Sequence, residues 1–513
     1  MAIDTGALSR PPAPHWFTPK RLLVVFFVIN VMNYMDRGTI ASNSVNGSPR
    51  ICTQSGVCSD GSGIQGDFDL TNFKDGVISS AFMVGLLVAS PIFASLAKSI
   101  NPFRLIGVGL SVWILAAAGC GFSVDFWSLV VCRMLVGVGE ASFSCLATPF
   151  IDDIAPVDQR TTWLGIFYMS LPTGVAVGYA YGGLVGAKLG WRCAFFGEAI
   201  LMLPFAILFF TMKPLHMKGI SIDKKFPMSL NDNLPNHSSK EHASYLSITS
   251  NQLSRFWVDI QAILHEKIYL INVLGMNAYY FVLGGYSYWG PKAGYSIYQM
   301  NNVDIFFGGI TITGGIIGTL GGSIILDRMK STIPNAFKVE ISIIYCIMET
   351  SDIHKIFKLE LLFTTTFFAA VFCFSAFCFS NLYVYMVLFL IGEILIFSNM
   401  GPINFVCLHT VTPTLRPLAM AMSIVSSHIF GDVLSTALVG KLQDKVDNWR
   451  TSILILTLVL FLATGIWFMG MFLHNLDRYD EDNEILVTTS KQSDVIPLLK
   501  NKSDDVIPTS TSL

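Results

Sequence analysis

Two acid–base combinations stand in stretches of the sequence that are otherwise apolar. Asp36 is followed directly by Arg37, and Arg133 precedes Glu140 by seven residues in a later stretch. An ionisable side chain is costly in an apolar, membrane-spanning segment, so these four residues are the first candidates for chemistry. Burial favours a neutral acid, whereas a nearby arginine favours a carboxylate. We therefore expect Asp36 and Glu140 to take up and release protons, with Arg37 and Arg133 as anion ligands or charge partners.

A structural role is the alternative for each acid. Asp36 and Arg37 would neutralise each other if a helix ended there, but Ile40 and the small residues after it indicate that the helix continues. A spacing of seven puts Arg133 and Glu140 on one helix face about two turns apart, too far for contact but suited to lining one cavity. Glu140 would otherwise bond to a neighbouring helix.

Polar and aromatic side chains near these pairs are candidate substrate ligands. Asn33 and Tyr34 stand beside the first pair, and Tyr288 lies in a later apolar stretch. That stretch is rich in aromatic residues, namely Tyr279, Tyr280, Tyr286, Tyr288 and Trp289. Aromatic residues near the end of a span are usually interfacial anchors, which is the role we favour. A wall for the apolar part of a ligand is the alternative.

Three further ionisable residues are secondary candidates. Glu393 has a more apolar context than Glu140, so a buried structural acid and a transport role are equally compatible with it. His428 and Asp432 are four residues apart and share a helix face. Such a pair can relay or sense protons, or pack against a neighbouring helix.

The composition indicates a membrane protein. Of the 513 residues, 52% are apolar and only 13% are charged, whereas soluble proteins carry about 25% charged residues. The formal net charge of −2 provides no basic surface for nucleic acid. The sequence has no phosphate-binding loop, zinc-ligand spacing or nucleophile elbow. We therefore predict no enzyme, no cofactor and no metal site, and an energy source in an ion gradient or the substrate's own gradient.

Apolar runs long enough to cross a bilayer predict an all-α membrane protein with about twelve transmembrane helices. The runs lie near 22–44, 74–96, 104–123, 127–150, 162–186, 193–212, 269–290, 304–326, 361–379, 382–407, 415–439 and 451–474. They divide the chain into two six-helix bundles, 22–212 and 269–474. Between them, 213–268 is predicted as a polar linker with an amphipathic piece at 256–268 that could lie on the membrane surface. The ends, 1–21 and 475–513, are predicted to be a cytosolic segment and a disordered cytosolic tail.

The halves contain traces of an internal repeat. Gly139-Glu140 is followed by Pro149 at the same spacing as Gly392-Glu393 by Pro402, as expected of a six-plus-six duplication. Within the second half, the segment 339–358 is additional to the repeat, contains several polar residues and is bracketed by Phe-Lys at 337–338 and again at 357–358. We interpret it as a translated intron or another gene-model artefact, with a real cytosolic loop insertion as the alternative.

Basic residues set the predicted orientation. Lysine and arginine gather before the first span, in the central linker and in the tail, so both termini and the linker should be cytosolic. The first interhelical loop then faces the other side of the membrane. It holds Cys52 and Cys58 in a polar Gly/Ser/Asp setting, where a small disulfide and two free thiols are both compatible with the sequence.

Several motifs in order resemble the Spinster family, and its plant branch most. They are 33–37 (NYMDR), 63–66 (GIQG), 133–141 (RMLVGVGEA), 287–294 (SYWGPKAG), 416–423 (RPLAMAMS) and 428–432 (HIFGD). The similarity runs from about 20 to 480 apart from 339–358. It implies a major facilitator fold with alternating access and a sphingolipid or lysophospholipid substrate. It also implies proton coupling through Asp36 and Glu140, with Arg37 and Arg133 as polar partners.

One expected gating motif is altered. Major facilitators usually carry a Gly-x-x-x-Asp-Arg loop after the second span, but this chain has Lys98 where the acid is expected. The counterpart after the eighth span keeps Asp327 and Arg328. The cytosolic latch of the first half must therefore differ from the family's pattern.

The tail contains a sorting signal of the acidic dileucine type, with Asp494, Leu498 and Leu499. Together with the resemblance, it favours the membrane of a late endosome, lysosome or vacuole and a sorting adaptor as partner; the plasma membrane and mitochondrial inner membrane stay open. We expect a monomer. The alternatives to a lipid carrier are a carrier for a small organic anion or other metabolite, and a non-transporting lipid sensor or scaffold.

Overall fold

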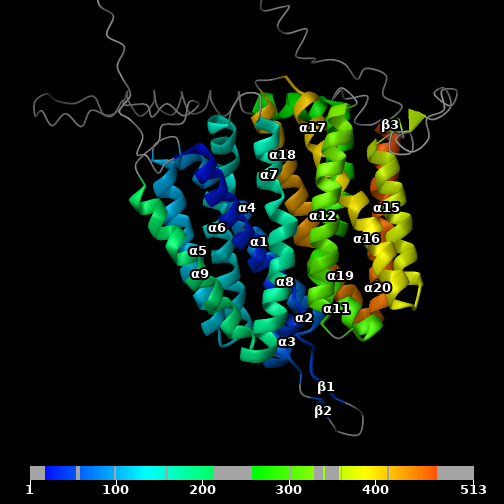
Figure 1. The fold of residues 1–513 in the computed structure, drawn as a ribbon. Helices are drawn as coiled ribbons and strands as arrows, with labels where there is room; N and C mark the ends of the chain where they lie inside the picture. Colours follow the sequence, from blue (N-terminus) through cyan, green and yellow to red (C-terminus); the bar gives the residue numbers. More distant parts are fainter. Residues whose placement is uncertain are drawn as a thin grey trace, which may run out of the picture.

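Long helices running side by side make up the molecule (Figure 1). The computed structural model describes residues 18–52, 58–59, 61–97, 100–155, 160–212, 257–300, 302–328, 339–340, 358–359, 361–412 and 415–470. The latch residue Lys98 and the sorting residues Asp494, Leu498 and Leu499 lie outside the described residues. Asp327 and Arg328 end a helix, and only their backbone is described.

The first half of the chain forms one bundle. Its helices are α1 (Pro19–Ala41), α2 (Asn43–Asn46), α3 (Gly63–Asp67), α4 (Asn72–Leu96), α5 (Pro102–Phe122), α6 (Phe126–Ile154), α7 (Arg160–Tyr168), α8 (Ser170–Leu189) and α9 (Trp191–Thr211). Within it α1 packs on α8, α4 on α6, and α5 on both α6 and α9. Because α1 runs on to Ala41, the prediction that this helix continues beyond Asp36 and Arg37 is confirmed.

The second half forms the other bundle. Its helices are α11 (Lys267–Tyr298), α12 (Val303–Arg328), α15 (Leu361–Cys378), α16 (Leu382–Ser398), α17 (Met400–His409), α18 (Arg416–Ser427), the π-helix η2 (His428–Val433), α19 (Leu434–Val446) and α20 (Trp449–Gly470). Here α11 packs on α20, α12 on α16, and α15 on both α16 and α20. A further helix at 257–265 lies across the end of the molecule opposite α2 and α3 (Figure 1).

The predicted fold class is confirmed. Among the described residues, helices occupy all twelve predicted spans, and ten of them are long and apolar enough to cross a membrane. The fifth span is divided into α7 and α8, and the tenth into α16 and α17. Pro172 and Pro402 lie in the first turn of α8 and α17, where a missing backbone N–H costs no hydrogen bond, so each proline is accommodated by restarting the helix.

Two short antiparallel ladders accompany the helices. Strands β1 (Ile51–Cys52) and β2 (Cys58–Ser59) place the backbone of Cys52 directly opposite that of Cys58. Strands β3 (Val339–Glu340) and β4 (Lys358–Leu359) pair the two ends of the segment that we interpret as a gene-model artefact, with a real loop insertion as the alternative. Residues 341–357 lie outside the described residues, so both interpretations of that segment stay predictions, as does the disulfide.

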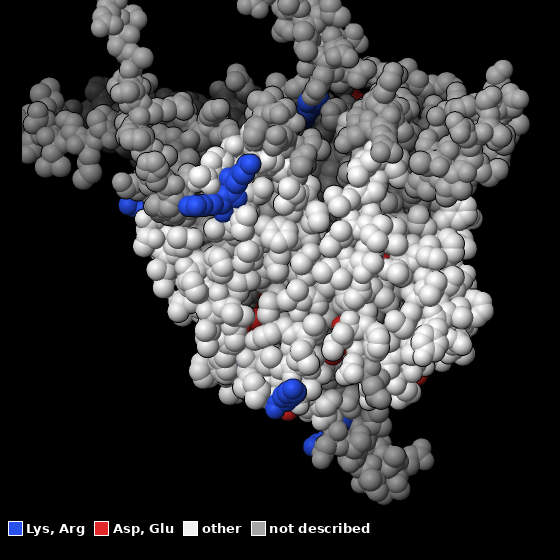
Figure 2. Space-filling model, in the orientation of Figure 1, with Lys and Arg blue, Asp and Glu red and all other residues white. Residues whose placement is uncertain are grey.

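The outer surface fits a lipid environment. The face in Figure 2 is almost free of charged side chains across its middle, and its lysines and arginines lie toward the two ends of the helices. Many large apolar side chains point outward, among them Leu115, Phe122 and Leu462. An exposed apolar belt of this kind is stable only against hydrocarbon, so the chain is an integral, multi-pass membrane protein.

Glycines bring α1 and α8 into backbone contact. A Cβ on Gly178 would lie 2.2 Å from the carbonyl oxygen of Met35, and one on Gly38 would lie 2.2 Å from that of Val175. Small residues allow such close approach between membrane helices. The contact fixes α1 on both sides of Asp36 and Arg37.

Alanine at Gly178 should therefore destabilise the protein, because its methyl group collides with a backbone that cannot move independently. We expect Gly178→Ala to cost about 1–3 kcal/mol, measured by thermal unfolding in detergent. The matched control is Gly165→Ala in α7, where nothing lies within 4 Å of the added Cβ. An equal stability of the two variants would contradict the close α1–α8 contact.

Candidate functional site

Two ion pairs join α1 to α6. Arg133 donates from Nη1 to Asp36 Oδ1 at 2.7 Å and from Nη2 to Oδ2 at 2.8 Å. Arg37 donates from Nη2 to Glu140 Oε1 at 2.5 Å. Adjacent helical residues point about 100° apart, so each member of the Asp36-Arg37 dipeptide reaches a different residue of α6. The two charges of the dipeptide are therefore paired separately rather than with each other.

The two pairs have different surroundings. The Asp36 and Arg133 side chains are 0% and 1% exposed, so Arg133 is buried in the bundle and does not line an open cavity. Arg37 is 18% exposed, and its guanidinium lies 4.5 Å from the ring of Tyr34. The ring of Phe82 separates the pairs, 4.8 Å from the Arg37 guanidinium and 5.3 Å from that of Arg133. We call Asp36–Arg133 the inner pair, in which both side chains are buried, and Arg37–Glu140 the outer pair, in which Arg37 is partly exposed and Glu140 is buried.

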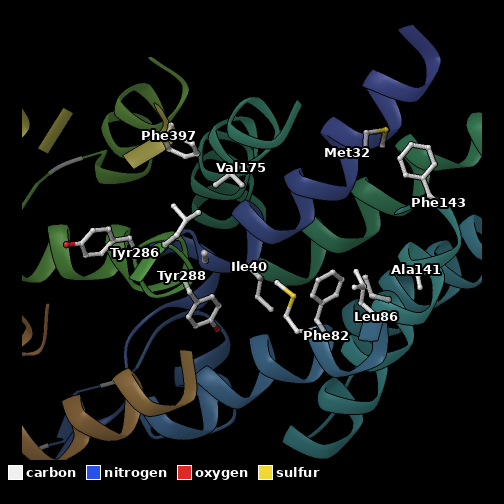
Figure 3. Close-up of a cluster of buried hydrophobic side chains, with 14 of the residues drawn as sticks. Met32, Ile40, Phe82, Leu86, Ala141, Phe143, Val175, Tyr286, Tyr288 and Phe397 are labelled. Atoms are coloured by element: carbon white, nitrogen blue, oxygen red, sulfur yellow. The ribbon is translucent and has the colours of Figure 1, made fainter. Parts of the chain in front are cut away.

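Phe82 belongs to a buried apolar cluster that supports both pairs. Figure 3 shows it with Ile40 of α1 and Leu86 of α4, close to Ala141 of α6. A guanidinium over an aromatic face is stabilised by the ring's negative face. These apolar walls exclude water, which strengthens the ion pairs and makes an unpaired charge there costly.

A third pair, His428–Asp432, lies in the other bundle. His428 Nδ1 and Asp432 Oδ2 are 2.9 Å apart in the π-helix η2, and both side chains are partly exposed. The predicted pairing of these residues on one helix face is thus present. Asp432 interacts electrostatically with Arg37, and His428 does so with Glu140. We refer to Tyr34 and these four residues as the central cluster.

The central cluster offers charges of both signs to a ligand between the bundles. Arg37 can donate to an anionic group, and the carboxylate of Asp432 can accept from a cationic group. Gly431 permits the irregular backbone of η2 to approach α11, because a Cβ there would lie 2.9 Å from that of Tyr280. π-Helical turns inside α-helices occur frequently at functional sites.

Three predicted residues lie elsewhere. Asn33 is fully buried, and neither atom of its side-chain amide has a hydrogen-bond partner. Glu393 is buried where α16 packs on α12, beside Thr311, with its Oε2 unpartnered. Tyr288 is buried at the end of the molecule near α2, away from the central cluster.

The prediction that the aromatic residues of α11 are interfacial anchors is wrong for four of the five, since Tyr279, Tyr286, Tyr288 and Trp289 are all buried. Tyr279 donates to the carbonyl of Ile396, and Trp289 to that of Thr436. The reason is tertiary: α11 packs against α18, η2, α19 and α20, so its aromatic side chains face protein rather than the membrane surface.

A polar network closes the end of the molecule near α2 and α3, and most of its residues are not among those predicted from the sequence. Asp75 of α4 accepts from Asn46 Nδ2 at 2.7 Å and from the Tyr288 hydroxyl at 2.9 Å. Lys292 of α11 donates to Asn46 Oδ1 at 3.0 Å and to Gln65, and its Nζ is 4.0 Å from Asp75 Oδ2. The signal available in the sequence was one acid, Asp75, at the start of the predicted span 74–96 and one lysine, Lys292, just beyond the predicted span 269–290.

Two more carboxylates strengthen this closure. Asp444 of α19 accepts from the backbone N–H groups of Asn72 and Phe73 at 2.9 and 2.8 Å, at the start of α4. Asp304 of α12 accepts from the backbone N–H of Asn43 at 2.7 Å, at the start of α2. Acids are stabilised at helix N-termini by the unpaired N–H groups and the helix dipole. The structure is therefore a conformation closed at the α2–α3 end.

Metal chemistry has no site in the part of the chain that the structure describes, where no group of three His, Cys, Asp or Glu residues could hold an ion. The central cluster is instead a set of paired charges between two bundles. It can bind a polar group and exchange protons.

Comparisons with known proteins point to one family. The profile of the Major Facilitator Superfamily matches residues 26–429. The chain is 56% identical over 503 residues to "Probable sphingolipid transporter spinster homolog 2" of Arabidopsis thaliana, covering 98% of this chain and 96% of that protein. It is 27% identical over 446 residues to "Protein spinster homolog 1" of Xenopus tropicalis, covering 84% and 74%.

Among solved structures, the fold is similar to that of a bacterial homolog of the human lysosomal transporter Spinster in an inward-facing, unoccupied conformation. The TM-score is 0.67 with 14% identity, covering 92% of this chain and 100% of that chain.

Replacing one member of the Asp36–Arg133 pair should lower the stability of the protein more than replacing both members. Arg133→Met leaves the Asp36 carboxylate buried without its bidentate donor, and we expect a loss of about 3–5 kcal/mol in unfolding free energy. Asp36→Leu combined with Arg133→Met should recover most of it, because no buried charge is then unpaired. Chemical unfolding in detergent measures both; a double variant no more stable than the single one would contradict this account.

Neutralising Asp444 should loosen the closed end. We expect Asp444→Asn to weaken the cap on α4 by about 1 kcal/mol, and so to raise the population open at this end about five-fold. Distances between spin labels replacing Lys188 of α8 and Lys445 of α19 report it. Asp447→Asn is the matched control, since Asp447 ends α19 in a left-handed conformation that asparagine also adopts. Identical distance distributions would refute the role of this cap.

Proposed function

The chain belongs to the major facilitator superfamily and, within it, to the spinster family, and on this premise we propose that it moves an amphiphilic lipid across a membrane by alternating access, driven by protons. The family is one of transporters rather than a class of enzymes. The proposed substrate class is sphingolipids or lysophospholipids. The printed name of the Arabidopsis relative, a probable sphingolipid transporter, supports this class.

The observation that carries the proposal is the central cluster, in which the partly exposed Arg37, paired with the buried Glu140, interacts with His428 and Asp432 of the other bundle. A phosphate-bearing or zwitterionic headgroup can satisfy both signs of charge at once. The apolar and aromatic side chains beside Arg37, such as Phe82 and Tyr34, suit the start of an acyl or sphingoid chain.

Proton coupling follows from competition for the arginines. Protonation of Glu140 removes the charge that holds Arg37 and leaves its guanidinium free for an anionic headgroup. Protonation of Asp36 would release Arg133 in the same way. In this proposal the two access states bind the proton with different affinities. A ligand with different affinities for two states shifts their equilibrium, so the proton can drive the change of access.

The proposal includes the orientation of the protein in the membrane and its subcellular location. We propose that both termini and the central linker are cytosolic, so that the closed end near α2 and α3 faces a lumen or the cell exterior. We further propose that the protein is a monomer in an endolysosomal or vacuolar membrane and that a sorting adaptor binds its tail.

Uptake into proteoliposomes tests the function. We expect labelled lysophospholipid or a labelled sphingoid-base lipid to enter faster with a pH gradient than without one, and small organic anions not to enter. Movement of small anions but not of lipid would replace the substrate class; binding of lipid with no movement would indicate a sensor.

Arg37 should be needed for the headgroup. We expect Arg37→Gln to lower lipid uptake at least ten-fold, since it loses a charge-assisted hydrogen bond of about 1.5–3 kcal/mol. Arg450→Gln is the control, because that arginine bonds to Ser380 far from the central cluster. An unchanged uptake by Arg37→Gln would remove this residue from the binding site.

A further inference from the structure

One buried acid beside the inner ion pair has no role in the proton coupling proposed above. Glu198 of α9 is 1% exposed, and neither oxygen of its carboxyl group has a hydrogen-bond partner. It interacts electrostatically with both Asp36 and Arg133. Glu198 therefore lies beside the Asp36–Arg133 pair and belongs to a third helix, α9, in addition to α1 and α6.

Three helices contribute groups to the described environment of Glu198. Asp36 and Thr39 face it from α1, Arg133 from α6 and Tyr181 from α8. Cys120 of α5 interacts with Asp36 and Arg133 in the same region. Among these described neighbours, Arg133 supplies the positive charge, and both of its terminal nitrogens already bind Asp36.

The charges of the buried region determine the state of Glu198. Arg133 is matched by Asp36 and Arg37 by Glu140, so a charged Glu198 would be a third carboxylate against two arginines. A buried, unpaired carboxylate costs several kcal/mol, and such a group becomes neutral instead. The charge balance of the conformation described here thus favours a neutral, protonated Glu198.

The same region can also accommodate the charged form for part of a cycle. The Nε–H of Arg133 is buried and has no partner. It is an unused donor within the charge network that Glu198 shares, and the Thr39 hydroxyl is another polar neighbour. An acid with a neutral resting state and an available cationic donor can be deprotonated without leaving its site.

We propose that Glu198 is a proton-carrying acid of the transport cycle, protonated in the conformation closed at the α2–α3 end and deprotonated in another. The proton comes from water and returns to water, no covalent bond of the protein changes, and the Asp36–Arg133 pair stays intact while Glu198 exchanges its proton. The five charged groups are then neutral together when Glu198 holds its proton and carry one negative charge when it does not. This inference rests on the proposed proton-driven transport.

Infrared spectroscopy of the full-length protein in lipid tests the proton directly. The wild type should show a carboxylic-acid C=O band that weakens as the pH is raised, and Glu198→Gln should lose this band. Glu140→Gln, which removes an ion-paired acid, should keep it. A band that Glu198→Gln leaves in place, or one that no pH change affects, would overturn the proposal, because the acid would then be ionised or permanently neutral.

Transport separates this inference from the function on which it rests. With a wild type that responds to a pH gradient, Glu198→Gln should reduce the ratio of gradient-driven to gradient-free lipid uptake at least five-fold, and Glu198→Asp, which keeps a titratable acid, should restore part of it. An equal ratio in Glu198→Gln and the wild type would overturn the role of Glu198 alone. A wild type without any gradient response would overturn proton coupling and this inference together.

Discussion

The ion pairs between α1 and α6 are the constraint on which the rest of the structure depends. Charges in a membrane interior persist only when paired, so Asp36-Arg37 of α1 and Arg133 and Glu140 of α6 hold these helices in one register. The backbone contact of α1 with α8 through Gly178 secures the other side of the same segment. Chemistry and packing thus converge on one stretch of α1.

The two ion pairs have different roles because they differ in burial. The inner pair is sealed behind Phe82 and gives the bundle a fixed electrostatic core, while the outer pair reaches the interface between the bundles. There Arg37 faces Asp432, so a change in its pairing is felt by both halves of the molecule. The closing network at the α2–α3 end holds the bundles together on one side, and rearrangement at the central cluster can be transmitted to it through α4 and α11.

The sequence was sufficient for the fold and for the first acids, and insufficient for their partners. Hydrophobic length predicts the spans, and acids inside them identify Asp36 and Glu140 as candidates. Which arginine binds which acid depends on the rotation of α1 against α6, which no spacing within one helix determines. Glu198 was missed although it lies inside a predicted span, because its charged neighbours come from other helices. The Asp75–Lys292 contact was missed because both residues stand at the ends of predicted spans, where charged residues are common. The tyrosines of α11 were misplaced because position along a span does not reveal which helices cover it.

The central claim is that protons drive transport by competing with an arginine for a carboxylate. The most direct measurement is the ratio of gradient-driven to gradient-free lipid uptake, compared between the wild type and Glu140→Gln in the same vesicles. The account predicts a ratio well above one in the wild type and close to one in Glu140→Gln, because a glutamine at this position cannot exchange a proton. A ratio that is unchanged by the substitution would contradict it.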